Sequence, residues 1–451
     1  MKKITTLMVT ALFASSVMNV WAQSANTTNA ATNYTDKQWE HYAADNYAGG
    51  TGTKDDPYLI STPEQFMKLA VEIENIGQID ENWDGDYTKG KYFKQTADLV
   101  FNEGLMSKVS GASGDASIID NSTLRTFNGI GYKAGDVDFQ RFAGTYDGDG
   151  HAIIGMYHNN SKNSGSGVFN FIEGATIKNL VVKEAYINAN ANVGLVVGSA
   201  DANSLIINCQ SSGIIYCGGS YHAGIVGALS ASKMLNCFSN AWVWAKNQAG
   251  GLCGRIMKSG YAANSYFTGW IGGVYSNMGK FKYWGAVCPE IGQSEETTTK
   301  PDSEDESKTI TFCENPSKAE NCFWTDTCTV RHKDVKAEAY NDINNCKYGI
   351  INNCKAFAVN DAAKAVDELN KNASSIEGAC SWELGKDGMP TLKFKSTNGI
   401  NTIKASAEKD DEGKVYTLYG ILIKEKSKEM NPVAGLAKGI YIVNGKKYVV
   451  E

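Results

Sequence analysis

The sequence is poor in several features that would place it in a common functional class. Its 451 residues include only 7 prolines, which argues against a proline-rich stalk, and its net charge of −6 comes without any basic block. Because nucleic-acid binding needs clustered lysine and arginine, we expect no nucleic-acid partner. Beyond residue 22, no stretch is apolar enough to cross a bilayer as a helix.

Recognisable catalytic and metal-binding motifs are also missing. The sequence has no convincing nucleophile elbow, HExxH zinc motif, Walker loop or dinucleotide-binding glycine motif, and its 11 cysteines include no CxxC pair. Asp147 and Asp149 have the spacing of an Asp-Gly turn rather than that of a calcium loop. His151 has no second ligand at a recognisable spacing. We therefore predict no cofactor and no metal ion, and the sequence identifies no catalytic residue.

The N-terminus has the pattern of a secretory signal peptide. Two lysines precede an apolar core, and Val20 and Ala22 put small residues at the −3 and −1 positions of a cleavage site. We predict that residues 1–22 are removed before Gln23 and that residues 23–48 form a flexible leader. The protein would then leave the cytoplasm.

A short unit recurs between residues 167 and 273. Its clearest mark is an asparagine that returns at intervals of 29, 28 and 28 residues (Asn179, Asn208, Asn236 and Asn264). A glycine-bounded apolar run precedes each asparagine, and a run rich in β-branched and aromatic residues follows it. A fixed period of this length indicates a solenoid. The apolar runs are too short for the paired helices of an α-solenoid, so the pattern favours β-strands.

We predict an all-β protein built on a parallel β-helix over residues 49–395, with three short strands in each coil. Equivalent asparagines would stack about 4.8 Å apart and hydrogen-bond along the rod. The alternative is that asparagine is simply common in turns. Before the repeats, Thr62 and Gln65 form a capping-box pattern that starts an amphipathic helix ending at Gly77. Such a helix would cover the open first coil.

The repeats also resemble a known family. Gly224-Ile-Val-Gly227 and Gly251-Leu-Cys-Gly254, each followed by an Asn-Cys or Asn-Ser step, resemble the GLUG-motif repeats of secreted bacterial surface proteins. Gly194-Leu-Val-Val-Gly198 has one inserted residue, and Gly167-Val-Phe-Asn170 lacks the closing glycine. The resemblance implies a right-handed β-helix. It implies no particular activity, because these repeats occur on proteins of different function, including zinc peptidases whose HExxH motif is missing here.

The pattern loosens after residue 273. Residues 274–320 form an acidic insertion that we interpret as a solvated loop, and Asn321-Cys322 resumes the repeat. Residues 360–371 have helical spacing, with Ala362, Ala363, Val366 and Leu369 on one face. Two apolar runs (Trp382–Gly385 and Met389–Phe394) would then close the solenoid.

The last part of the chain, residues 396–451, is predicted to form a small separate β-domain. Alternating strands surround Asn444-Gly445, a strong hairpin signal. The run from Lys438 to Lys447 resembles the C-terminal sorting domain of type IX secretion substrates, which implies an export address that is often removed. The alternative is a β-module that packs on the end of the solenoid.

Cysteine spacing leaves two alternatives open. Cys209 and Cys237 hold the same repeat position, so they would form either a buried ladder or a bond. The pairs Cys322/Cys328 and Cys346/Cys354 have spacings that would permit local loop bridges.

Aromatic residues cluster at two repeat positions, six and eight residues after the asparagine. If the aliphatic set seven residues after it fills the bore, the aromatic side chains face outward. In the first repeat, this register puts Ala185 and Ile187 outside and Tyr186 inside. The predicted ligand-binding patch consists of Tyr216, Trp242, Trp244 and Trp270. Exposed rings of this kind suit sugar stacking or a protein contact; alternatively, the 274–320 insertion covers them or they pack inward.

The sequence therefore favours a secreted or surface-displayed, non-catalytic binding or adhesion scaffold for a host or environmental glycan or a surface protein. The second hypothesis for its function is a carbohydrate-active enzyme, a lyase or glycosidase, on the same fold. The third hypothesis is a structural surface component. A groove that holds carboxylates together with lysine or arginine would favour the enzyme, and one with only aromatics and amides would favour the scaffold.

Overall fold

The computed structural model describes residues 34–394, except 80–86, 110–119, 132–139, 274–282, 293–296, 302–308, 332–334, 341–345 and 347, and parts of 414–450. The predicted signal peptide, residues 23–33 of the predicted leader and the Asn444-Gly445 turn lie outside these residues. Residues 34–48 of the predicted flexible leader are described, and they include the short helix η2 (Trp39–Tyr42), in which Trp39 is buried in the hydrophobic core. This part of the leader is therefore packed against the first unit. The chain divides into two compact units, one ending at Phe394 and the other beginning at Lys395. Each unit is described by itself.

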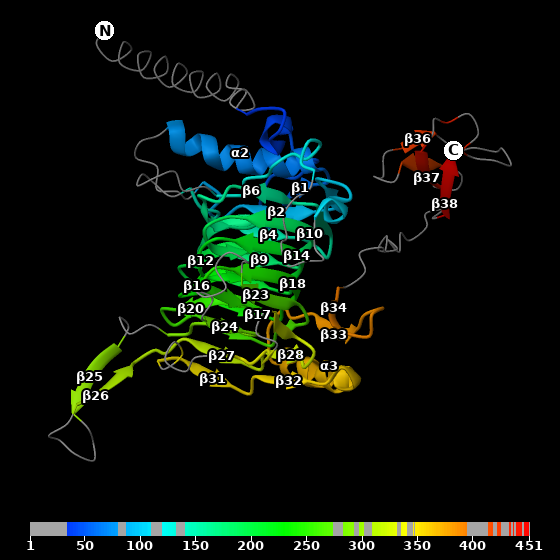
Figure 1. Cartoon of the computed structure of the whole chain (residues 1–451). Coiled ribbons are helices and arrows are strands. Elements are labelled where there is room, and N and C mark those ends of the chain that lie inside the picture. Colours follow the sequence, from blue (N-terminus) through cyan, green and yellow to red (C-terminus); the bar gives the residue numbers. More distant parts are fainter. Residues whose placement is uncertain are drawn as a thin grey trace, which may run out of the picture. The chain divides into compact units, whose positions relative to one another are not determined.

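The first unit is a parallel β-solenoid, which confirms the predicted fold class (Figure 1). Four sheets run along the rod, and we number them 1 to 4. Sheet 1 contains β1 (Tyr58–Ile60), β2 (Tyr92–Gln95), β4 (Thr145–Asp147), β9 (Thr176–Lys178), β13 (Leu205–Ile207), β17 (Lys233–Leu235), β21 (Tyr261–Ala263), β27 (Lys318–Glu320) and β31 (Ile350–Asn352). Sheet 2 contains β3 (Leu99–Val100), β5 (Ala152–Ile154), β6 (Tyr157–Asn159), β10 (Val181–Asn188), β14 (Gln210–Cys217), β18 (Phe238–Ala245), β22 (Tyr266–Phe267), β23 (Trp270–Gly273), β28 (Phe323–Thr325), β29 (Thr329–Arg331), β30 (Val335–Lys336) and β32 (Lys355–Phe357). Sheet 3 contains β7 (Ser164–Ser166), β11 (Ala191–Gly194), β15 (His222–Ala223), β19 (Gln248–Gly250) and β24 (Tyr283–Gly285). Sheet 4 contains β8 (Phe169–Glu173), β12 (Val197–Asp201), β16 (Val226–Ser230) and β20 (Cys253–Met257).

A described coil in the middle of the rod uses four strands, not the predicted three. One coil runs through β9, β10, β11 and β12, and the next runs through β13, β14, β15 and β16. Each strand pairs in parallel with its counterpart in the next coil. The glycine-bounded run that the sequence presents as one segment contains a corner, so it supplies strands to two sheets.

The interior of the rod consists of stacked apolar side chains. In sheet 1, Ile177, Ile206 and Met234 occupy one column in register, and all three are fully buried. Burial of each such side chain contributes about 1.5–3 kcal/mol to folding. The columns continue from coil to coil, so the core is one continuous stack.

The recurring asparagines form a hydrogen-bonded ladder at the corner between sheets 1 and 2, which confirms the predicted stack. The Nδ2 atoms of Asn208, Asn236 and Asn264 each donate to the Oδ1 atom of the asparagine one coil earlier, at 2.9, 2.8 and 2.8 Å. Asn179 donates in turn to Asp147 at 2.9 Å. The four asparagines have φ values of 49–54°, a left-handed conformation that asparagine adopts more readily than most residues. The side chain and the backbone geometry therefore both favour asparagine at this corner.

The register of the first repeat differs from the predicted one because it contains an extra residue. A bulge between Val182 and Ala185 shifts the pairing, so Tyr186 aligns with Ile214 and Ile187 aligns with Ile215. Tyr186 therefore belongs to the outward column and Ile187 to the inward one, opposite to the prediction. The bulge adds one residue to this repeat, which explains why the interval from Asn179 to Asn208 is 29 residues rather than 28. Glu184 lies in the bulge and has a φ of 53°.

The N-terminal helix caps the rod as predicted. α2 (Pro63–Ile79) begins after Thr62, whose Oγ1 accepts from the Gln65 amide at 3.3 Å, while the Gln65 side chain reaches the Ser61 amide at 2.8 Å. The Phe66 ring is fully buried and makes edge contacts with aromatic rings of the first coils. The prediction that Gly77 ends the helix is wrong, because the helix continues to Ile79.

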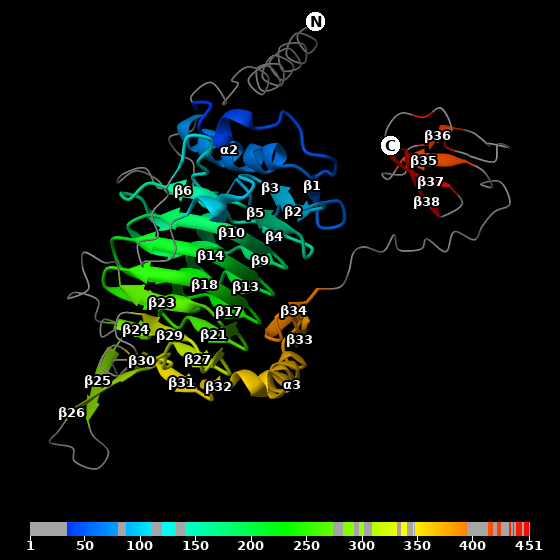
Figure 2. The same cartoon turned by 45° about the vertical axis from the view of Figure 1, so that its right-hand side comes forward.

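The segment after the last coil does not close the solenoid, contrary to prediction. α3 (Ala362–Ala373) leads to an antiparallel hairpin, β33 (Ser381–Leu384) and β34 (Pro390–Lys393), which lies along the side of the rod (Figure 2). We call residues 362–394 the strap. Trp382 donates through Nε1 to Asn236 at 2.6 Å, and Asn236 donates to the Cys380 carbonyl at 2.9 Å. The strap therefore covers the asparagine ladder.

The buried face of α3 differs from the predicted face by one position. Ala362, Ala365, Leu369 and Ala373 are buried, whereas Ala363 is exposed. Tyr266 and Phe323 on the solenoid pack against this face. The helix thus docks on the outer side of sheet 2.

The 274–320 region is more structured than the predicted loop. Its described residues include β24 and the antiparallel hairpin of β25 (Thr297–Pro301) and β26 (Thr309–Cys313). As predicted, Asn321 resumes the repeat, with a φ of 51°. A further coil follows, in which Asn353 donates to Asn321 at 2.6 Å.

The cysteines at the repeat position form a ladder. Cys209 and Cys237 are fully buried, and their thiols lie 3.4 and 3.3 Å from the carbonyl oxygens of Ile207 and Leu235. No disulfide joins cysteines in the described part of the chain. The permitted loop bridges are therefore not formed there.

The second unit contains a small antiparallel sheet in the order β36 (Leu422–Lys424), β35 (Val415–Thr417), β37 (Gly439–Val443) and β38 (Lys446–Val450). Val443 pairs with Lys446, which leaves a two-residue connection between β37 and β38. Val415, Val433, Tyr441 and Val443 form its core. No helix among the described residues is long and apolar enough to span a membrane.

Candidate ligand-binding surfaces

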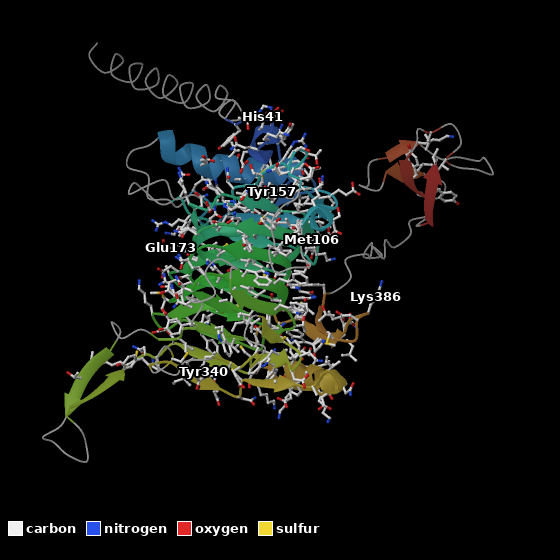
Figure 3. The ribbon with its side chains drawn as sticks, viewed as in Figure 1. His41, Met106, Tyr157, Glu173, Tyr340 and Lys386 are labelled. Carbon is white, nitrogen blue, oxygen red and sulfur yellow. The ribbon has the colours of Figure 1, made fainter. Side chains whose placement is uncertain are left out.

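The predicted aromatic patch is largely a packed column on the outside of sheet 2. Tyr157, Tyr186, Ile214, Trp242 and Trp270 follow one another in register, one from each coil. The short helix η3 (Leu105–Lys108) packs on the upper part of this column, where Figure 3 labels Met106 and Tyr157. Among the described residues, the segment that packs on the upper rings is η3, which belongs to residues 102–126.

Trp244 is not a surface residue, contrary to prediction. Only 2% of it is exposed, and its ring lies against Gly272 of the next coil, where a Cβ atom would come within 2.7 Å of the ring. The glycine makes room for the indole, so the ring fills the space beside the sheet. Tyr216, Trp242 and Trp270 remain partly exposed.

Trp242 and Trp270 stack on each other with ring centroids 5.2 Å apart and planes inclined by 15°. Each ring therefore uses one face for its neighbour. A sugar stacks on an open aromatic face, and the stacking leaves each of these two rings with at most one face for a ligand. Ligand binding by Tyr216, Trp242 and Trp270 stays a prediction, with less open ring surface than the sequence pattern indicated.

A more open surface lies on the outside of sheet 1. A cavity of about 650 Å³ extends over β9, β13, β17 and β21 and is walled on one side by residues 375–378 of the strap. A second cavity of about 510 Å³ adjoins it and shares Lys233 and Tyr261 with it. We call the two together the sheet 1 groove. Because it follows successive coils, it runs along the rod.

The floor of the sheet 1 groove comes from two outward columns. One column runs Thr176, Leu205, Lys233, Tyr261 and Lys318, and the other runs Lys178, Ile207, Leu235, Ala263 and Glu320. Strand alternation explains these sets, because the residues between them point into the bore. The groove thus has Lys233 and Tyr261 near its middle, aliphatic residues beside them (Leu205, Ile207 and Leu235) and polar residues at both ends.

Tyr261 is held rigidly at the junction of the two cavities. Its hydroxyl donates to Glu320 at 2.7 Å, and the Asn352 amide donates to the same carboxylate at 3.1 Å. The two hydrogen bonds lower the pKa of Glu320, and desolvation together with the carboxylate raises the pKa of Tyr261 above its usual value. At neutral pH the pair is therefore a neutral phenol bonded to a carboxylate. The ring position is fixed before any ligand arrives.

A third surface lies on the outside of sheet 4, away from the aromatic column. It is a cavity of about 340 Å³, and Figure 3 shows Glu173 at this side of the rod. Five charged residues line the cavity: Arg141, Glu173, Asp201, Arg255 and Lys258. The sequence pattern did not reveal this cluster. Glu173, Asp201 and Arg255 come from sheet 4, but Arg141 and Lys258 lie on connections that only the fold brings together.

Both carboxylates of this cluster already have partners. Glu173 forms an ion pair with Arg141. Asp201 accepts from the Ser230 hydroxyl at 3.1 Å and from the Ala202 amide at 2.8 Å. These contacts hold the two carboxylates in place, so the cluster is suited to binding polar groups. Within the described residues, no group of three or more His, Cys, Asp or Glu side chains could hold a metal ion.

No family model matches the chain, and no curated protein matches it. One solved structure, a Bacteroides ovatus protein provisionally named an immunoglobulin A1 protease, matches with a TM-score of 0.44 and 16% identity, covering 77% of this chain and 96% of that chain. A similarity this weak supports no inference about activity.

Proposed function

We propose that this protein is an exported, non-catalytic scaffold that binds an extended glycan in the sheet 1 groove. The observation that carries the proposal is the continuity of the groove across five coils, from Thr176 to Lys318. At about 4.8 Å per coil, this distance is about 19 Å. A chain-like ligand could therefore contact equivalent positions in successive coils.

The chemistry of the groove fits a glycan. Leu205 and Leu235 offer apolar surface to the C–H face of a sugar, and the Tyr261 ring is held at the centre of the groove. The exposed ammonium group of Lys233 and the carboxylate of Glu377 provide hydrogen-bond partners for hydroxyls. Rigid aromatic and aliphatic groups bind without a large loss of side-chain entropy.

Replacing Tyr261 with alanine is expected to weaken glycan binding about tenfold or more, because the ring is removed from the centre of the groove. The experiment starts from a glycan array, followed by titration calorimetry with the best ligand. Tyr261→Phe keeps the ring but loses the bond to Glu320, so its affinity should stay within about threefold of the parent. Lys183→Ala, on an exposed residue of sheet 2, is the control. Unchanged affinity in Tyr261→Ala would contradict the proposal.

A second candidate, a carbohydrate-active enzyme, is favoured by carboxylates that lie beside basic residues. They occur in the sheet 1 groove (Lys233, Lys318, Glu320 and Glu377) and in the charged cavity on sheet 4. The cavity on sheet 4 brings two carboxylates and three basic residues together, a combination that lyases and glycosidases use. However, Glu173 and Asp201 are both engaged within the fold, which favours binding over proton transfer. Incubation with the array-selected glycan, with assays for reducing ends and unsaturated products, separates the two. Turnover would contradict the scaffold.

Export rests on the sequence features at the two ends of the chain. We expect the mature protein, isolated from outside the cytoplasm of its own cell, to begin at Gln23 when its N-terminus is determined by mass spectrometry. If residues 396–451 are a sorting domain, a chain lacking them should accumulate before the outer membrane while the solenoid still folds. A full-length chain that keeps Met1 and stays in the cytoplasm would contradict export.

A further inference from the structure

A column of small, mostly sulfur-bearing side chains runs beside the corner asparagines into the last coils of the rod. The residue that follows the asparagine in five successive coils is Cys209, Cys237, Ser265, Cys322 and Cys354. Ser265 divides the four cysteines into two pairs of neighbours. In the second pair, Glu320 aligns with Asn352 and Phe323 aligns with Lys355. Cys322 and Cys354 therefore occupy the same position in two adjacent coils.

The spacing of adjacent coils suits a bond between these two cysteines. Neighbouring parallel strands lie about 4.8 Å apart, and the Cα atoms of a disulfide lie about 4.4–6.8 Å apart. At the preceding position, the Asn353 side chain donates to Asn321 at 2.6 Å, which holds the two coils in register. Both cysteines are free thiols in this structure.

Accessibility distinguishes this pair from the pair in the middle of the rod. Cys209 and Cys237 are fully buried, with further coils on both sides. Cys354 lies between β31 and β32 in the last described coil, at the end of the rod away from α2 (Figure 1). It is only partly buried, and its two neighbours in sequence, Asn353 and Lys355, are exposed. A dissolved oxidant can therefore reach Cys354 without opening the core.

The two thiols also differ in how readily they ionise. A hydrogen bond between them is the main reason that the pKa of Cys322 is raised and the pKa of Cys354 is lowered, and burial raises the pKa of Cys322 further. The thiolate is the form that attacks a disulfide. The more accessible cysteine is thus also the better nucleophile.

We propose that Cys322 and Cys354 form a reversible disulfide that ties the last two described coils together. The oxidant is a small-molecule disulfide, with glutathione disulfide as the probe. The Cys354 thiolate attacks one sulfur of the oxidant, so a mixed disulfide forms and a first thiolate leaves. The Cys322 sulfur then attacks the Cys354 sulfur, loses its proton and displaces the second thiol. The pair gives up two electrons and two protons, and the oxidant is reduced to two thiols.

The disulfide joins the two coils that position Tyr261 in the sheet 1 groove. Glu320 and Asn352 form the hydrogen bonds that fix this ring, and each lies two residues before a cysteine of the pair. The strap begins at Ala362, soon after Cys354 in the chain. Oxidation would therefore brace one end of the groove and the start of its wall. The bond itself can form whether or not the groove binds a glycan.

The test is incubation of the purified full-length chain with glutathione disulfide, then alkylation of free thiols, digestion and mass spectrometry without reduction. We expect a peptide cross-linked between Cys322 and Cys354 that dithiothreitol separates. The amides of β31 and β32 should then exchange hydrogen about threefold or more slowly. No cross-link, a stable mixed disulfide on Cys354, or a covalent dimer through Cys354 would overturn the proposal. A Cys209–Cys237 bond formed as fast as the proposed one would overturn the argument from accessibility.

Three variants make the assignment specific. Cys322→Ser should stop at the mixed disulfide on Cys354, because no second thiol can displace glutathione. Cys354→Ser, at the more exposed position, should block both steps and serves if Cys322→Ser folds poorly. Cys313→Ser removes another partly exposed thiol, near the end of β26, and should leave the cross-link unchanged. Tyr261→Ala should also leave it unchanged, so failure of the sheet 1 groove and failure of the disulfide are distinguishable.

Discussion

Replacing Asn236 with alanine is expected to reduce the free energy of unfolding by roughly 4–5 kcal/mol. The Asn236 side chain is fully buried and makes four hydrogen bonds, to Asn208, Asn264, Trp382 and the Cys380 carbonyl. Each is worth about 1 kcal/mol net, and the left-handed backbone adds about 1 kcal/mol more when asparagine is lost. The loss corresponds to a decrease in Tm on the order of 5 °C for a unit of this size.

Asn203→Ala is the matched control for this prediction. Asn203 also has a left-handed conformation, with a φ of 63°, but it is exposed and lies outside the ladder. Its replacement should cost about 1 kcal/mol, which is the backbone contribution alone. Thermal unfolding followed by circular dichroism measures both variants. Equal losses in the two would show that the ladder bonds contribute nothing to stability.

The wild-type protein is expected to lose stability at acidic pH because of His222, and replacing His222 with valine is expected to remove this loss. His222 is fully buried, and neither ring nitrogen has a hydrogen-bond partner within the described residues. The equivalent positions in neighbouring coils hold Val193 and Ala249, so the site accepts an apolar side chain. Burial lowers the pKa of His222 from 6.5 to about 3.

The direction of the pH effect follows from proton linkage. Below pH 6.5 the unfolded chain binds a proton at His222 that the folded protein does not bind until pH is near 3, so lower pH favours unfolding. Over this window the wild type should lose about 1.4 kcal/mol per pH unit relative to His222→Val, or about 2.7 kcal/mol by pH 4.5. Denaturant unfolding at pH 8 and at pH 4.5 measures the difference. A difference that does not change with pH would refute the buried, neutral histidine.

The repeat was predictable because it is a local pattern repeated at a fixed interval. The corner asparagine, the inward aliphatic column and the capping helix all depend on residues close in sequence, and the structure contains all three. The predicted register failed only at the first repeat, where the interval of 29 residues conceals the bulge at Glu184. A single inserted residue reverses which side chains face outward, since side chains alternate along a strand.

The binding surfaces were less predictable because they depend on what covers each sheet. Trp244 has the repeat position of an outward residue, yet Gly272 of the next coil and the segment around Leu105 enclose it. Tyr261 has no special signal in the sequence, and its role depends on the strap residues 375–378 that wall the groove. The contacts of Trp244 with the segment around Leu105, and of the groove with the strap, join residues separated by more than a hundred positions, which a periodic pattern cannot encode.

The sequence by itself determined the rod, because stacking identical turns needs only the same short pattern of apolar, glycine and asparagine residues in each turn. It also determined which side chains fill the bore and which corner carries the amide ladder. Only the tertiary structure decided which outer faces stay open, since the strap covers the ladder and η3 covers the upper aromatic column. It alone placed Arg141 and Lys258 beside Glu173 and Asp201, because charged groups on separate connections meet only after the turns have stacked.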